Sequence, residues 1–315
     1  MDRCSTGSGQ ARAGSAAETF MNAACSRFWA HRCADIHQAV ACGDTGLSRQ
    51  YSLCGDPAQA DVYEIAVLRD PASRGGSLWL HQHAQPGAVL PVRGPRNHFP
   101  LEAPAQHLVL VAGGIGITPI SAMARQAQAQ GLAYSLHYCG SQRAHMPYLA
   151  ELQAHHGAAL QLHVSAEGSR LDVAALLATP QPGTLIYACG PQRLLQALAD
   201  ATAHWPDDSL RVEHFHASAA TAAQPGDTAF EVELQHSGRV ITVGATQSLL
   251  AALRGAGLTI ASDCQEGLCG SCQLGVVDGA IQHRDQVLTR AERAAGSAII
   301  SCCSRAASGR LVLEL

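Results

Sequence analysis

Between residues 104 and 216, short apolar runs alternate with amphipathic segments. The apolar runs predict five strands, at residues 107–112, 133–138, 160–164, 184–188 and 210–215. The segments between them predict helices: one with Thr118 at the N-cap and Pro119 at the first turn, ending near Gly131, and others at 147–156, after Asp172, and at 192–203. Repeated strand–helix units indicate a parallel sheet covered on both faces, which binds ligands at the carboxyl ends of its strands.

Two glycine-rich turns fall at such carboxyl ends. The first contains Gly113, Gly114 and Gly116, and the second is Cys189-Gly190-Pro191. Glycine-rich turns that open helices expose backbone N–H groups to phosphates. Their shared position predicts a nucleotide site, although an ordinary strand-ending turn would also explain Cys189-Gly190-Pro191.

Residues 47–103 predict strands at 49–53, 62–68 and 88–93. Gly75 and Gly76 precede a short helix at 78–83, for which Ser77 is the predicted N-cap. A glycine-rich helix start favours an anion, although most Gly-Gly-Ser turns bind nothing.

Residues 1–47 contain one Val, one Ile and one Leu, but four cysteines. Strands are enriched in β-branched and aromatic residues, so no strand is predicted here, and disorder is the simplest interpretation. A transit peptide is a competing interpretation that Asp35 and Asp44 fit poorly.

Residues 217–228 have the composition of a linker. A hairpin is predicted at 230–234 and 239–243 around Ser237-Gly238, then a helix capped by Thr246 and ended by Gly255. A last strand is predicted at 310–315. This order predicts a small β-grasp domain.

A cysteine pattern dominates this C-terminal region. Cys264, Cys269 and Cys272 form C-x4-C-x2-C, and Cys302 follows at a distance. Plant-type ferredoxins use this spacing for a [2Fe–2S] cluster. A zinc site usually needs two C-x2–4-C pairs, and a disulfide framework needs an oxidising compartment, so both are weaker alternatives. Cys303 is an alternative fourth ligand.

Length and charge narrow the function further. The 315 residues suffice for two or three domains, and the net charge of −4 without a long charged run argues against nucleic acid. No apolar run approaches the roughly 18 residues of a membrane span. The 12 cysteines are mostly scattered, which fits a reducing cytoplasm.

Together these motifs resemble the phthalate dioxygenase reductase family, including reductase subunits of vanillate O-demethylases, over residues 47–315. Arg49-Gln-Tyr51-Ser52-Leu53 is similar to the family's flavin motif. The resemblance implies that Tyr51 packs on the isoalloxazine, Ser52 lies near its reactive nitrogen and Arg49 meets the phosphate. Arg74-Gly75-Gly76-Ser77 is similar to the FMN phosphate loop.

The remaining motifs follow in the family's order. Pro95 to Phe99 is similar to the passage into the nicotinamide domain. Gly113 to Pro119 and Cys189 to Pro191 are similar to its dinucleotide motifs, with Cys189 beside the nicotinamide. Glu213-His214-Phe215 is similar to a strand end at which Phe215 would shield the flavin.

The resemblance implies a multidomain α/β plus β fold. A flavin-binding β-barrel is expected at 1–103, a parallel-sheet NAD-binding domain at 104–216 and a β-grasp [2Fe–2S] ferredoxin domain at 229–315. The expected function is a monomeric cytoplasmic reductase that passes electrons from NADH through FMN and the cluster to a Rieske-type oxygenase. The alternatives are a non-catalytic ferredoxin-type carrier and a reductase for another acceptor. No general acid or base is expected, and the preference for NADH rests on the family, since Ser141 and Arg143 are able to hold a 2′-phosphate.

Residues 1–47 depart from the family, whose barrel has about three strands before the flavin motif. The upstream length is preserved without the pattern, so we hypothesise a disturbed reading frame and an incomplete barrel. His31-Arg32-Cys33-Ala34 is codon-compatible with Ile-Asp-Val in another frame. Gene sequencing that finds one unbroken family-like frame through codons 1–47 would exclude this hypothesis.

Overall fold

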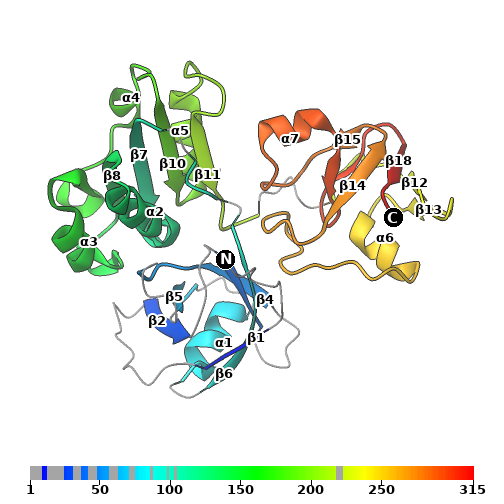
Figure 1. Ribbon diagram of the computed structural model, residues 1–315, viewed down its shortest axis with the longest axis horizontal. Coiled ribbons are helices and arrows are strands. Elements are labelled where there is room, and N and C mark those ends of the chain that lie inside the picture. The colour runs from blue at the N-terminus through cyan, green and yellow to red at the C-terminus, as the bar shows by residue number, and fades with distance from the viewer. Residues whose placement is uncertain are drawn as a thin grey trace. The chain divides into compact units, whose positions relative to one another are not determined.

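The computed structural model describes residues 9–12, 25–30, 37–41, 48–56, 63–70, 75–85, 88–97, 99–102, 105–217 and 223–315. The chain divides into two compact units, Met1–Glu213 and His214–Leu315 (Figure 1). The predicted boundary between a flavin and a nicotinamide domain falls inside the first unit and stays a prediction. Over the described ranges, no helix has both the length and the apolarity needed to cross a bilayer.

A parallel sheet of five strands forms the second half of the first unit. Its strands are β7 (His107–Gly113), β8 (Ala133–Gly140), β9 (Leu160–Val164), β10 (Thr184–Cys189) and β11 (Leu210–Glu213), in the order β11-β10-β7-β8-β9. Every pairing in it is parallel. The predicted doubly covered sheet is confirmed, and β9 has the predicted bounds.

Helices cover this sheet because residues of β7 alternate between its two faces (Figure 1). Val109 and Val111 belong to one apolar cluster with Leu195 and Leu198 of α5 (Gln192–Ala201). The helix α2 (Ile117–Ala129) contacts β7, β8 and β10. The other helices of this half are listed in chain order: η2 (Gly114–Gly116), η3 (Arg143–His145), α3 (Leu149–His156), η4 (Gly157–Ala159), η5 (Ser165–Glu167) and α4 (Val173–Leu176).

Helix starts were predicted less well than strands. Asp172 caps α4 as predicted, because its Oδ1 accepts a hydrogen bond from the Ala175 N–H at 2.9 Å. The prediction that Thr118 caps α2 is wrong. The chain is already helical at Gly116, since η2 runs directly into α2, and the Thr118 hydroxyl donates to the Ile115 carbonyl at 3.0 Å instead.

The first half of the unit is built from antiparallel strands. These are β1 (Gly9–Arg12), β2 (Cys25–Ala30), β3 (His37–Ala41), β4 (Ser48–Ser52), β5 (Tyr63–Leu68) and β6 (Val89–Arg96). They form one sheet in the order β1-β6-β3-β4 and a separate pair β2-β5. The described strands therefore make two sheets and not a closed barrel, as the expected incomplete barrel requires.

The prediction that residues 1–47 form no strands is wrong, because β1, β2 and β3 all lie there. The backbone provides the reason. β3 pairs on both sides, with β4 and with β6, so ladder hydrogen bonds outweigh the weak strand propensity of its side chains.

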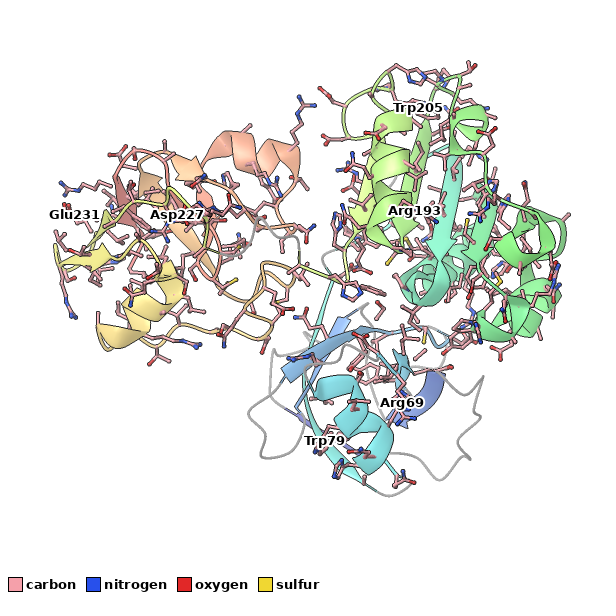
Figure 2. All side chains as sticks on the ribbon, turned by 180° about the vertical axis from the view of Figure 1, so that it is seen from behind. Arg69, Trp79, Arg193, Trp205, Asp227 and Glu231 are labelled. Carbon is pink, nitrogen blue, oxygen red and sulfur yellow. The ribbon has the colours of Figure 1, made fainter. Side chains whose placement is uncertain are left out.

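The helix α1 (Gly76–His83) packs its Leu80 against Ile65, Val67 and Leu90. Trp79, shown in Figure 2, lies at the edge of this cluster. The N-cap is Gly75, at φ 103°, and not Ser77 as predicted. Glycine adopts this left-handed conformation at little cost, so the backbone and not a side chain sets where α1 begins.

The second unit is a β-grasp fold, as predicted. Its five-stranded sheet has the order β13-β12-β18-β14-β16, from β12 (Phe230–Leu234), β13 (Val240–Val243), β14 (Gln273–Asp278), β16 (Ala298–Ile300) and β18 (Arg310–Leu313). β15 (Ile281–Gln282) pairs with β17 (Arg305–Ala306), and α6 (Leu249–Gly255) and α7 (Arg290–Ala295) complete the unit.

The core of this unit includes Leu249, Leu250 and Leu253 of α6. The cap of α6 is Ser248, whose Oγ accepts from the Ala251 N–H at 3.1 Å, so the prediction of Thr246 is wrong by two residues. The helix ends at Gly255 as predicted.

The end of the predicted linker is anchored to this unit. Asp227, labelled in Figure 2, accepts a hydrogen bond from Nη1 of Arg284 at 2.9 Å. The Arg284 side chain is only 4% exposed, and its hydrogen bond holds the pKa of Asp227 below its usual value. The ion pair with this buried cation thus anchors residues near 227.

A stacked pair of histidines, of which His137 is buried, predicts how stability depends on pH. Nδ1 of His137 on β8 lies 3.2 Å from Nε2 of His163 on β9, and burial, followed by the charge of His163, lowers the pKa of His137 to about 4. Between that pH and about 6.5 the unfolded chain binds more protons, so unfolding free energy falls as pH falls. Across this pH range the lowered pKa of His137 reduces the free energy of unfolding by about 3 kcal/mol.

Urea unfolding at pH 4.5 and 7 tests this prediction. His137→Gln should reduce the loss of stability between the two pH values, whereas His204→Gln, at an exposed histidine, should leave it unchanged. An equal pH dependence in both variants would contradict the prediction.

Candidate functional site

The two predicted glycine-rich turns lie against each other at the carboxyl ends of β7 and β10. A Cβ on Gly116 would stand 2.2 Å from the carbonyl oxygen of Cys189, and one on Gly113 would stand 2.6 Å from Cδ of Pro191. A Cβ on Gly190 would lie 3.0 Å from the Gly113 backbone. Only glycine permits this approach, which leaves a cradle of backbone at the point where a parallel sheet binds nucleotides.

Most side chains beside this cradle are buried. Cys189 is fully buried, and burial followed by the charge of Glu213 raises its pKa well above the usual value. Thr118 and Pro119 are buried in the first turn of α2. Gly114, at φ 55°, has open space where a Cβ would point. The cradle is therefore formed by backbone, with a protonated thiol at its floor.

Arg49 of the predicted flavin motif reaches the start of α1. The side chain of Arg49 covers Gly76, where a Cβ would stand 2.5 Å from Cγ of Arg49. The hydroxyls of Ser52 and Ser77 are buried without a hydrogen-bond partner among the described residues. A buried polar group without a partner is costly, so both hydroxyls fit a bound polar ligand. Arg74 lies outside the described residues.

Tyr51 is half-buried at the edge of the cluster that contains Leu80. Phe215 is partly buried beyond the end of β11 and belongs to the second unit. The structure thus brings Arg49 to the start of α1, and it places Phe215 in the other unit.

The flavin-motif region and the nucleotide turn are in contact inside the first unit, since β5 lies against η2. A buried hydrogen-bond cluster reinforces this contact. The Tyr148 hydroxyl donates to Oε1 of Glu64 at 2.8 Å and lies 3.0 Å from Sγ of Cys54. Nη1 of Arg125 donates to the Cys54 carbonyl at 2.9 Å. Sequence reasoning missed this cluster, whose only signal is a glutamate inside the apolar run of β5.

Tyr148 also adopts an unusual backbone conformation, at φ 60° and ψ 10°. A non-glycine residue enters this left-handed region at a cost of about 1–2 kcal/mol. Burial, followed by Cys54 and Glu64, raises the pKa of the phenol, so it remains a donor. The hydrogen bonds to Glu64 and Cys54 hold the ring in place despite the strained backbone.

In the second unit the predicted cluster cysteines come together as two pairs. Hydrogen bonding to Cys264 is the largest cause that lowers the pKa of Cys269 to about 5. The Cys302 side chain is likewise the largest cause that raises the pKa of Cys272, so these two thiols lie close to each other. A [2Fe–2S] cluster takes two protein ligands on each iron, so two thiol pairs fit it. In the described part of the chain, no three His, Cys, Asp or Glu side chains are placed to hold a single metal ion.

The loop between these cysteines turns its backbone toward the sulfurs. The Gly267 N–H donates to Sγ of Cys302 and the Glu266 N–H to Sγ of Cys264, both at 3.3 Å. Gly267 and Gly270 both have positive φ, at 71° and 65°. Such N–H groups stabilise negative charge on sulfur, which favours thiolates.

The adjacent cysteines Cys302 and Cys303 have different partners. Cys302 meets Cys272 and the Gly267 N–H, whereas Cys303 belongs to the apolar core and its Sγ lies 3.8 Å from the Ile300 carbonyl. The geometry therefore favours Cys302 as the fourth ligand.

Comparisons with known proteins agree with this geometry. Residues 232–307 match the 2Fe-2S iron-sulfur cluster binding domain family, and residues 91–209 match the N-terminal domain of dimethylamine monooxygenase subunit DmmA-like proteins. Phenoxybenzoate dioxygenase subunit beta of Ectopseudomonas oleovorans is 42% identical over 271 residues, which are 86% of this chain and 84% of that protein. The solved structure of phthalate dioxygenase reductase is 33% identical, covers 98% of both chains and has a TM-score of 0.69. The chain belongs to the phthalate dioxygenase reductase family.

A second solved structure extends the comparison. An intact type IV self-sufficient cytochrome P450 monooxygenase is 44% identical, with a TM-score of 0.92. The match covers 98% of this chain, which spans 41% of that one. As a member of the reductase family, this chain is an oxidoreductase with a flavin, NADH and a [2Fe–2S] cluster as cofactors, and it passes electrons to an oxygenase.

The contacts of Tyr148 predict that loss of its hydroxyl lowers stability more than loss of another tyrosine hydroxyl. Tyr148→Phe removes a donor from a buried carboxylate and should lower the free energy of unfolding of the reductase by about 1.5–3 kcal/mol. Tyr134→Phe is the matched control, because the Tyr134 hydroxyl bonds the imidazole of His156 at 2.7 Å and not a carboxylate, so its loss should cost about 1 kcal/mol or less. Urea unfolding measures both, and equal losses would contradict the role of Glu64.

The fourth cluster ligand can be tested with two neighbouring substitutions. Cys303→Ser should keep about two iron atoms per chain, whereas Cys302→Ser should lose most of them. Iron analysis and visible absorption of the purified reductase report the difference. Iron loss confined to Cys303→Ser would assign the ligand to Cys303 instead.

Proposed function

We propose that this chain supplies electrons from NADH to a Rieske-type oxygenase, with FMN as its flavin. The observation that carries the proposal is the contact of β5 with η2, because it joins the flavin-motif region to the nucleotide cradle within one unit. Hydride transfer needs the two rings in contact, and a scaffold that fixes both pieces provides that at no further cost on binding.

For the flavin, we assign phosphate binding to Arg49 and the start of α1. The guanidinium stem lies on Gly76, and the N-terminus of α1 favours an anion through its dipole. Gly75, Ser77 and Arg74 complete the proposed phosphate loop, in agreement with the buried hydroxyl of Ser77. A terminal phosphate beside an arginine and a helix start fits FMN.

The flavin ring is assigned to Tyr51 and Ser52. Tyr51 offers an aromatic face at the edge of the Leu80 cluster. The buried Ser52 hydroxyl is available to bond a ring nitrogen. The shielding of the flavin by Phe215 stays a prediction from the family resemblance.

For the nucleotide, Gly113, Gly114 and Gly116 would hold the pyrophosphate through backbone N–H groups, with Thr118 and Pro119 fixing the start of α2. Gly190 and Pro191 would border the nicotinamide, and Cys189 would lie beneath it as a protonated thiol. When bound, the flavin accepts a hydride and releases electrons one at a time. The chain itself positions the rings and excludes water, and no side chain here needs to act as a general acid or base.

We assign the electron acceptor from reduction potentials and from the similarity to known proteins. Plant-type clusters lie near roughly −400 mV, below the roughly −150 to +300 mV of Rieske centres, so transfer is downhill. Cys264, Cys269, Cys272 and Cys302 are the proposed ligands. The similarity to a cytochrome P450 chain makes a haem oxygenase the competing acceptor. Mixing the reduced protein with purified oxygenases of each kind distinguishes them.

Anaerobic addition of NADH, followed by electron paramagnetic resonance, tests the whole relay. We expect the reduced-cluster signal to appear on addition of NADH, because hydride transfer to the bound flavin would supply electrons to the cluster. A signal that appears only with dithionite would show an assembled cluster without the flavin step. The chain would then be a ferredoxin-type carrier.

A further inference from the structure

The site for the adenosine ribose presents a conflict of charge. In a doubly wound sheet this ribose is recognised after the second strand, where an acidic residue accepts from the NADH 2′-hydroxyl and an arginine accommodates the NADPH 2′-phosphate. The second strand is β8, which ends at Gly140 and is followed by Ser141, Gln142 and Arg143. This loop carries a cation and no acid, although the family uses NADH.

The neighbouring strand end provides the missing acid. Glu167, in the turn η5 after β9, accepts two parallel hydrogen bonds from Arg143: Nε donates to Oε1 at 2.7 Å and Nη2 donates to Oε2 at 2.9 Å. A bidentate pair of this kind uses an edge of the guanidinium that could otherwise donate two hydrogen bonds to a phosphate. Glu167 raises the pKa of Arg143, and Arg143 lowers the pKa of Glu167, so both side chains stay charged.

The backbone holds the two loops together. The Ala166 N–H donates to the Ser141 carbonyl at 3.0 Å, and the Met146 N–H donates to the Arg143 carbonyl at 3.0 Å. Met146 folds over Gly140 so closely that a Cβ there would stand 2.5 Å from its Cγ. Because both loops are anchored in this way, the pair meets without ordering a mobile segment.

We propose that Glu167 is the coenzyme-selectivity residue of this reductase. Its carboxylate occupies the Nε and Nη2 donors of Arg143 and repels a 2′-phosphate, while a 2′-hydroxyl is accommodated beside the pair. This inference rests on the proposed binding of NADH at the carboxyl ends of β7 to β10. An exposed ion pair contributes little stability, with side chains here 46% and 47% exposed, so one substitution is enough to release Arg143 without harming the fold.

The experiment compares coenzymes in the full-length protein, with ferricyanide as acceptor. Glu167→Gln should raise kcat/KM for NADPH about tenfold, the value of one charge-assisted hydrogen bond, and change that for NADH by less than about twofold. Adding Arg143→Gln to Glu167→Gln should return NADPH to the original value. Asp200→Asn removes the same charge from the last turn of α5 and should leave kcat/KM unchanged for both coenzymes.

A binding measurement gives a second readout that does not involve turnover. Calorimetry with adenosine 2′,5′-bisphosphate and with AMP should show about a tenfold gain in Glu167→Gln for the bisphosphate alone. An unchanged preference in Glu167→Gln, or equal use of NADPH by the original protein, overturns the inference while leaving the proposed function intact. Failure of both coenzymes to reduce the original protein would instead overturn the proposed function.

Discussion

A buried hydrogen-bond cluster joins the flavin-motif region to the nucleotide-binding sheet, and the proposed relay depends on it. Burying the carboxylate of Glu64 costs free energy unless donors meet it, and the Tyr148 hydroxyl is one such donor. The same phenol lies beside Cys54, whose carbonyl also receives Arg125 of α2. Each group therefore stabilises the others only when both parts of the unit are in place. A polar cluster of this kind fixes one arrangement where an apolar contact would tolerate several.

The strands were largely predictable from the sequence, whereas helix starts were not. The alternation of apolar residues placed β9 and β12 at their observed bounds, because burial on a sheet leaves a direct record in the pattern. The caps depend on local backbone conformation, and this is why Gly75 and Ser248 replaced the predicted residues. Residues 1–47 were mispredicted because strand pairing with β4 and β6 outweighs composition.

The candidate site also has some features that the sequence predicts and others that it does not. Glycine turns and cysteine spacing carry strong sequence signals, because close backbone approach and thiolate ligation each admit few residue types. The choice between Cys302 and Cys303 needed the direction of each side chain, which spacing does not encode. The contacts of Glu64 with Tyr148 join residues 84 positions apart in the chain, so no local pattern announces them.

These observations separate what the fold fixes from what single side chains adjust. The cradle at Gly113, Gly116 and Gly190 is built from backbone, and a Cβ added at any of them would force the two turns apart, so the proposed nucleotide site is inseparable from the fold. The proposed site for the 2′ position of the ribose is formed by Arg143 and Glu167, whose side chains are half-exposed. Exposed charges contribute little to stability, so they can change without cost to the core. Coenzyme choice can therefore change by one residue in this scaffold, whereas the nucleotide site itself cannot.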